Sequence, residues 1–218
     1  MYLCINTMEQ HTLELLGTVL VTLITALLGP AGVEYVKSKL SKNIEPVVID
    51  PVKKELEQSA IITEELEYIR EKFNADRAWI SIIHNGGHFL HTNKSIQKFS
   101  VMHEVSRLGV SSLGMTFNNL PISLFSRSVE QQMIGNTIYI SDVNNPEIST
   151  FGLKAALESV GTVSAVSKGI FDMSTDSLIG SIGLDYLHPT NLTKEEINAF
   201  NMRSERMSGY ISNFIKEI

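Results

Sequence analysis

Four histidines that follow one another closely are the residues best suited to chemistry, because imidazole is a common metal ligand. They are His84, His88, His91 and His103. The pair Asn85-Gly86 is a strong signal for a two-residue hairpin turn, since both turn positions need a positive φ. Side chains alternate between the faces of paired strands, so this turn would place His84 and His91 on one face and His88 on the other. Metal ligands must converge within about 2.1 Å of one ion. The pattern therefore predicts no metal site, and it names no cofactor.

The same hairpin is a candidate wall of a ligand pocket. At its rim, the neutral ring of His84 could hydrogen-bond to a polar ligand, or it could simply cap the turn. The segment after the hairpin is expected to close over the sheet. The predicted ligand-binding residues are His84, Asn85, Glu104 and Ser123 on the polar side, and Phe89, Phe99 and Phe125 on the apolar side. The phenylalanines fit plain core packing equally well.

We predict no catalytic residues and no enzyme. The chain has no Gly-x-Ser-x-Gly elbow, P-loop, His-Glu-x-x-His or Gly-x-Gly-x-x-Gly motif. Asp142 and Asp185 each end a predicted strand and are expected to act as turn or cap residues. The single cysteine, Cys4, allows no intrachain disulfide. A net charge of −6 without a basic stripe argues against a nucleic-acid partner.

The N-terminal part predicts a membrane contact. After a tail over residues 1–14, an uncharged run from Leu15 to Val33 would extend about 28 Å as a helix, close to the roughly 30 Å hydrocarbon core. We predict a transmembrane or hydrophobic anchor helix over residues 15–36, although Gly29-Pro30 interrupts it. The lysines that follow place the N-terminus outside the inner (cytoplasmic) membrane and the soluble domain in the cytoplasm, as a single-pass protein. The alternative is a hydrophobic helix that packs with copies of itself.

Two amphipathic helices are expected to bracket one domain. Residues 37–51 read as a linker, and residues 52–73 carry apolar side chains at three- and four-residue spacing. Residues 191–218 form the second helix, with Thr193 and Glu196 as a capping box. Its register, which includes Met207 and Ile211, is that of a coiled-coil seam. We therefore expect the two helices to pack together and to form a homo-oligomer.

The domain between the helices, residues 74–190, mixes strand and helix signals. Strands are expected in the first hairpin and at 99–105, 137–141, 162–171 and 178–186, and helices after Pro121 and at 152–159. The helix after Pro121 would pack through Ile122, Phe125, Val129 and Met133. This order, βββ-α-β-α-ββ-α, predicts an α+β fold: an antiparallel sheet with helices on one side, preceded by a hydrophobic helix and a charged amphipathic helix.

The order and spacing of these elements from Leu66 to Ile218 resemble the GAF domain, a small-molecule sensing relative of PAS. The segments Thr137 to Asp142 and Leu178 to Asp185 are similar to two characteristic strands of that family. The resemblance implies a ligand between the sheet and the crossover segment, and dimerisation through flanking helices. The cyclic-nucleotide signature and a pocket cysteine for bilin attachment are absent. The anchor, the charged helix and the His84 to Gly87 stretch together also resemble membrane-anchored proteins of tailed phages.

Two functions follow from this resemblance. The first is a membrane-anchored, non-enzymatic GAF-like sensory or binding module with a small-molecule ligand. The second is a structural or assembly protein whose degenerate GAF scaffold holds no ligand. The resemblance to phage proteins would make such a protein phage-encoded. The interior discriminates them: a cavity of about 300 Å³ or more lined by polar groups would favour binding. Phenylalanines that fill it would favour a scaffold.

Overall fold

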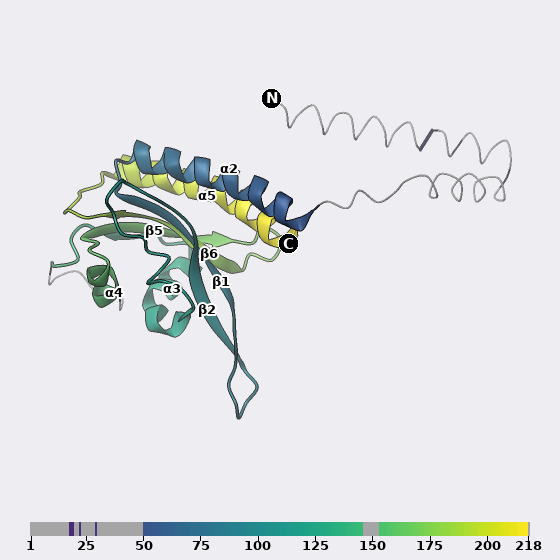
Figure 1. The fold of residues 1–218 in the computed structure, drawn as a ribbon, viewed down its shortest axis with the longest axis horizontal. Helices are drawn as coiled ribbons and strands as arrows, with labels where there is room; N and C mark the ends of the chain where they lie inside the picture. Colours follow the sequence, from purple (N-terminus) through teal and green to yellow (C-terminus); the bar gives the residue numbers. More distant parts are fainter. Residues whose placement is uncertain (1–17, 20–21, 23–28, 30–49, 146–152, 218) are drawn as a thin grey trace. The chain divides into compact units, whose positions relative to one another are not determined.

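Six antiparallel strands form the sheet that organises the described domain (Figure 1). They are β1 (Arg77–His88), β2 (Ser95–Ser106), β3 (Leu120–Pro121), β4 (Ile138–Ile140), β5 (Ser164–Phe171) and β6 (Leu178–Tyr186). Their order across the sheet is β3-β2-β1-β6-β5-β4. The predicted α+β class with an antiparallel sheet is confirmed.

The computed structural model describes residues 18–19, 22, 29, 50–145 and 153–217. The predicted tail (1–14), almost all of the predicted anchor (15–36) and the predicted linker (37–51, apart from its last two residues) lie outside the described residues. Among the helices that are described, none combines the length and the apolar character needed to cross a bilayer. The chain divides into the units Met1–Ile49 and Asp50–Ile218. The second unit carries everything that follows.

Helices α2 (Pro51–Lys72) and α5 (Lys194–Glu217) lie side by side over one face of the sheet (Figure 1). Helix α2 begins at Asp50, whose Oδ1 accepts a hydrogen bond from Val52 N at 3.0 Å. At α5, Thr193 N donates to Glu196 Oε2 at 2.8 Å, and Glu196 N donates to Thr193 Oγ1 at 3.2 Å. The predicted capping box is confirmed, and it satisfies backbone donors that an α-helix start leaves free.

The main core lies between these two helices and the sheet. It contains Leu66 and Ile69 of α2, Met207 and Ile211 of α5, and Ile80 of β1, all at most 1% exposed. Met207 and Ile211 were predicted to lie in a coiled-coil seam, and they are buried against the sheet of their own domain. Their three-four spacing is instead the stripe of a helix that packs on its own sheet.

The opposite face of the sheet is covered as well, by η1 (Ile122–Phe125), α3 (Ser126–Met133) and α4 (Lys154–Ser159) (Figure 1). The prediction that helices lie on one side only is therefore corrected. Alternation along β1 shows why. Ala78 and Ile80 join the core under α2 and α5, while Trp79 and Ser81 face the other side. That side is covered by the crossover segment, the part of the chain between β2 and β5 that carries η1, α3 and α4. A strand that is buried on both faces needs a covering layer on each.

The first hairpin differs from its prediction. Strand β1 continues through Asn85 and Gly86, and His84 lies opposite Lys98 rather than Gly87. The Asn-Gly pair begins a β-bulge, with a register shift between Asn85 and His88 and a φ of +106° at Gly87. The turn lies further out, where Asn93 N donates to Phe89 O at 2.9 Å. The predicted tight turn at Asn85-Gly86 is therefore wrong, and so is the pairing of residues that placed the histidines on the two faces.

Leu66→Ala tests the core under α2. The side chain is 0% exposed, so its loss should lower the free energy of unfolding by about 2–5 kcal/mol, through lost burial and a residual cavity. Leu56→Ala on the same helix is the matched control, because Leu56 is 66% exposed and its removal should change stability by less than about 0.5 kcal/mol. Urea unfolding measures both. Equal losses would contradict the packing of α2 on the sheet.

Candidate functional site

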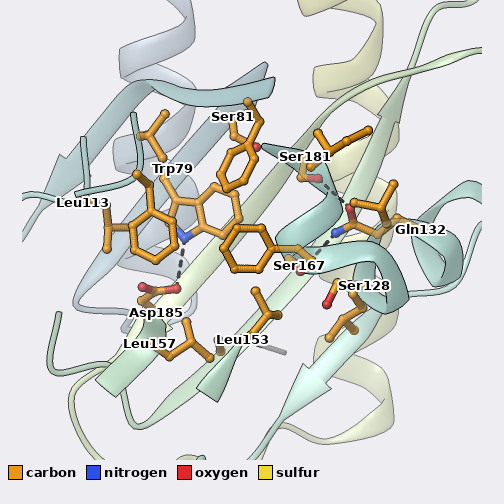
Figure 2. Close-up of a pocket in the computed structure, with 18 of the residues that line it drawn as sticks. Trp79, Ser81, Leu113, Ser128, Gln132, Leu153, Leu157, Ser167, Ser181 and Asp185 are labelled. Carbon is orange, nitrogen blue, oxygen red and sulfur yellow. Dashed lines mark hydrogen bonds between the residues drawn. The ribbon is translucent and has the colours of Figure 1, made fainter. Parts of the chain in front are cut away.

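A cavity of about 100 Å³ lies between the sheet and the crossover segment (Figure 2). Strands β1, β2, β4, β5 and β6 supply one side, and η1, α3 and α4 with neighbouring loop residues supply the other. Its lining is mostly apolar, with Trp79, Phe99, Phe117, Phe125, Ile138, Ile140, Leu153 and Leu157 among the contributing residues. This volume is below the roughly 300–1,000 Å³ of pockets that hold drug-sized ligands.

Three phenylalanines form a large part of the apolar wall. The ring centroids of Phe99 and Phe125 are 5.2 Å apart in an edge-to-face arrangement, and Phe117 lies 6.4 Å and 6.5 Å from them. Phe117 and Phe125 are buried. These contacts are within the range of favourable aromatic pairs, so the three rings hold one another in place.

The polar end of the cavity is built by α3 and the two strands below it (Figure 2). Gln132, which is 5% exposed, donates from Nε2 to Ser167 Oγ at 3.2 Å and accepts from Ser181 Oγ at Oε1, 2.6 Å away. Ser128 lies one helical turn earlier, on the same side of α3. Its Oγ is buried, lines the cavity and has no hydrogen-bond partner. A buried hydroxyl left unpaired costs about 1–3 kcal/mol, which a ligand or a water molecule would recover.

At the other end, Asp185 is held by a buried network. Its carboxylate accepts from Trp79 Nε1 at 3.0 Å and Thr162 Oγ1 at 2.8 Å, and Arg77 Nε lies 3.8 Å away. Burial raises the pKa of Asp185, while these hydrogen bonds and the Arg77 guanidinium act in the opposite direction. Asp142 does cap a turn as predicted, by accepting from Asn144 N at 2.8 Å. Asp185 does not, because its partners lie on other elements.

Glu104 lies outside the cavity and holds the crossover loop. Its carboxylate accepts from Ser112 Oγ at 2.7 Å, Leu113 N at 2.9 Å and Gly114 N at 3.1 Å. Partial burial alone would raise the pKa of Glu104, but these hydrogen bonds, with one from Ser106, outweigh burial and hold the pKa below its usual value. The residue is thus a loop anchor in its carboxylate form.

The structure places the other expected ligand residues apart from one another. His84 Nε2 lies 2.9 Å from Ser100 Oγ, and Asn85 Oδ1 accepts from Gly87 N and Ser95 Oγ. Ser123 is exposed on η1, and Phe89 is exposed at the hairpin end. Of the seven residues predicted to bind ligand, Phe99 and Phe125 line the cavity and the other five do not. For His84, Asn85 and Phe89, the extended hairpin is the reason, because it carries these residues past the edge of the crossover segment.

The residues that sequence reasoning missed are Ser128 and Gln132. The predicted apolar face of α3 included Met133, which is 60% exposed, whereas Gln132 is 5% exposed. Both lie in the helix predicted after Pro121, and their spacing of four residues puts them on one face of it, which was a usable signal for a polar pair that points inward.

A second hollow, of about 410 Å³, lies where residues 109–112 and 116 meet residues 159–161 and Leu187. Its lining is glycine, serine, threonine, valine and leucine, without a titratable side chain. Among the described residues, no group of three or more His, Cys, Asp or Glu side chains is placed to hold a metal ion. The cavity beneath α3 is therefore the stronger candidate site.

Comparison with solved structures shows what this arrangement resembles. A phycocyanobilin-bound GAF domain from a cyanobacterial phytochrome matches with a TM-score of 0.57 at 16% identity, over 84% of this chain and 93% of that one. The GAF3 domain, in its photoproduct state, of a Synechocystis sp. PCC6803 protein matches with 0.55 at 14% identity, over 72% and 94%. The fold is GAF-like. A far-red cyanobacteriochrome photoreceptor also matches, with 0.57 at 11% identity, over 83% and 98%. No family model and no curated protein matches the chain.

Glu104→Gln tests the loop anchor. Replacing a carboxylate that accepts several hydrogen bonds should lower the free energy of unfolding at pH 7 by about 1–2 kcal/mol, given that the group is only half-buried. A lowered folded pKa gives stability that is complete above the ordinary glutamate pKa and is lost as pH falls through the folded pKa. The difference from wild type should therefore shrink below about pH 4.

Urea unfolding between pH 7 and pH 3 measures this difference. Glu67→Gln on the exposed face of α2 is the control, and it should show little effect at any pH. A Glu104→Gln deficit that stays constant across the range would show that the carboxylate charge does not hold the loop.

Proposed function

We propose that the chain is a non-enzymatic GAF-like binding module for a small, uncharged and mainly apolar ligand with one hydrogen-bonding group. The unpaired Ser128 hydroxyl is the observation that carries this proposal, because it is a buried polar atom that faces an apolar cavity. Ligand pockets typically combine an apolar lining with a few polar groups that fix orientation. Ser128 and Gln132 are such groups here.

The size of the cavity limits the ligand. About 100 Å³ suits a compact molecule of one ring or less, unless the cavity widens on binding. A bilin, the ligand named for one of the structural neighbours, is not proposed. The only cysteine of the chain is Cys4, far in sequence from every lining residue.

A ligand at Ser128 would have a route to the long helices. Gln132 of α3 bonds Ser167 of β5, and the next residue of that strand, Lys168, reaches Glu205 of α5 at 3.1 Å on the opposite face. We propose that occupancy shifts α5 through β5, which requires that the ligand bind two arrangements with different affinity.

Homo-oligomerisation through the flanking helices and a membrane anchor complete the proposal. The helices carry exposed apolar side chains, among them Leu56 (66%) and Tyr68 (46%) of α2 and Met202 (72%) of α5. A second copy would cover them. The length and composition of the uncharged run support the anchor over residues 15–36, and the lysines that follow the run support a place for the domain in the cytoplasm.

A second candidate is the scaffold without a ligand. The contact among Phe99, Phe117 and Phe125 favours it, because these rings already occupy much of the space between sheet and crossover. Binding to the purified chain separates the two candidates.

Benzyl alcohol and toluene are matched probes, since they differ by one hydroxymethyl group in place of a methyl. The binding module should bind benzyl alcohol about two- to tenfold more tightly than toluene, which is the value of one hydrogen bond. Ser128→Ala should remove that preference and leave toluene binding unchanged. Ser126→Ala, exposed on the same helix, is the control. Isothermal titration calorimetry gives the affinities, and absence of binding by either probe would favour the scaffold.

Leu20→Asp combined with Leu23→Asp tests the anchor. Two charges within a membrane-spanning run are costly, so the variant should move from the membrane fraction to the soluble fraction after cell lysis. Leu108→Asp, at a fully exposed position outside the flanking helices, should leave the distribution unchanged. A doubly substituted chain that stays with the membrane would contradict the anchor.

A further inference from the structure

The outer end of the β1–β2 hairpin stands apart from the rest of the sheet (Figure 1). Pairing of β1 with β6 ends at Ile82 opposite Gly180, and β2 meets β3 only at Lys98 and Phe99. Residues 84–97 therefore form a two-stranded ribbon, beside which the described part of the chain places no third strand. An isolated ribbon is only marginally stable in water, so a binding partner for the projecting end is a natural explanation for it.

The turn at the end of this ribbon is built by specific contacts. Phe89 N donates to Lys94 O at 3.0 Å, Asn93 N donates to Phe89 O at 2.9 Å, and Asn93 adopts a φ of +51°. Lower down, Ser95 Oγ donates to Asn85 Oδ1 at 2.8 Å across the two strands. These bonds order the loop, and they leave the side chain of Leu90 98% exposed and that of Phe89 54% exposed.

The charge of the hairpin is opposite to that of the whole chain. No Asp or Glu occurs between Asp76 and Glu104, whereas the chain carries a net charge of −6. The ribbon and its turn contain Lys94 together with His84, His88 and His91, and Lys98 follows at the base of the ribbon. Gly86 lies against the aliphatic stem of Lys98, where any larger side chain would collide with it. The stem thus packs along the ribbon, and a lysine whose stem is packed in this way can extend its ammonium group toward an anionic surface.

We propose that the tip of this hairpin, Phe89 and Leu90 with Lys94, inserts into the interface of an anionic lipid bilayer, and that Lys98, at the base of the ribbon, adds a second cation that the negative headgroups attract. Adjacent exposed apolar side chains beside cations suit a surface that offers acyl chains below negative headgroups. A protein partner fits less well. Two side chains expose on the order of a few hundred Å², against about 800 Å² per partner in a stable interface.

This contact does not depend on the ligand cavity or on the predicted anchor, because it involves different residues. Its test follows the tip itself. Leu90→Trp in the full chain reports insertion, and Leu108→Trp is the matched control, since Leu108 is a fully exposed leucine beyond the opposite end of β2. The chain is combined with phosphatidylcholine vesicles that contain either no charged lipid or 30% phosphatidylserine, by reconstitution if it is membrane-bound and by mixing if it is soluble.

Fluorescence quenching by brominated lipid is the measurement. We expect Trp at position 90 to be quenched and blue-shifted with phosphatidylserine, and Trp at position 108 to be unaffected. Lys94→Gln and Lys98→Gln should each weaken insertion about fivefold, as expected for one cation near an anionic surface. Equal behaviour of the two tryptophans would overturn the proposal. A blue shift at position 90 that grows with protein concentration without vesicles would also overturn it, in favour of contact between copies of this chain.

Discussion

The buried ion pair of Arg77 and Asp185 is the constraint on which the arrangement of this domain depends. The two residues lie on adjacent central strands and are at most 1% exposed. Arg77 also donates to Ser111 O and Val160 O, both at 2.8 Å, in the loops before η1 and after α4. A buried pair of this kind is costly to break, by about 3–5 kcal/mol when one partner is removed. It therefore fixes both ends of the crossover segment at a set distance from the sheet.

The cavity follows from that fixed distance. With the crossover segment held at Ser111 and Val160, the space beneath α3 is filled by three phenylalanine rings on one side and bordered by Gln132 and Ser128 on the other. Most of its polar atoms bond to one another, and the Ser128 hydroxyl does not. A ligand bonded to this hydroxyl would lie against β5. Since β5 contacts the cavity on one face and α5 on the other, a shift of β5 would reach the helices.

Different surfaces of the domain have different chemistry. The exposed side of α2 is rich in glutamate, and Glu65 pairs with Arg203 and Arg206 where α2 meets α5. Beyond Ile82, the ionisable side chains of the hairpin are lysines and histidines, without a carboxylate. Such a separation of charge orients a molecule near a charged surface, and it turns the basic ribbon rather than the acidic helix toward negative charge.

Local patterns along the chain were enough to place most of the helices and the later strands. Three-four spacing located α2 and α5, Thr193 and Glu196 marked the start of α5, and the strand-like runs at 162–171 and 178–186 located β5 and β6, because these signals are local. Tertiary structure decided the rest. Asn85-Gly86 forms a bulge instead of a turn, because β1 continues past this pair to His88, which lies opposite Ser95 of β2. Met207 and Ile211 pack on the sheet of their own domain. The spacing of apolar residues along a helix shows that one face is buried, but it does not specify what covers that face. Ser128 and Gln132 reached the cavity through the rotation of α3 against β5 and β6, which long-range packing sets and no local pattern specifies.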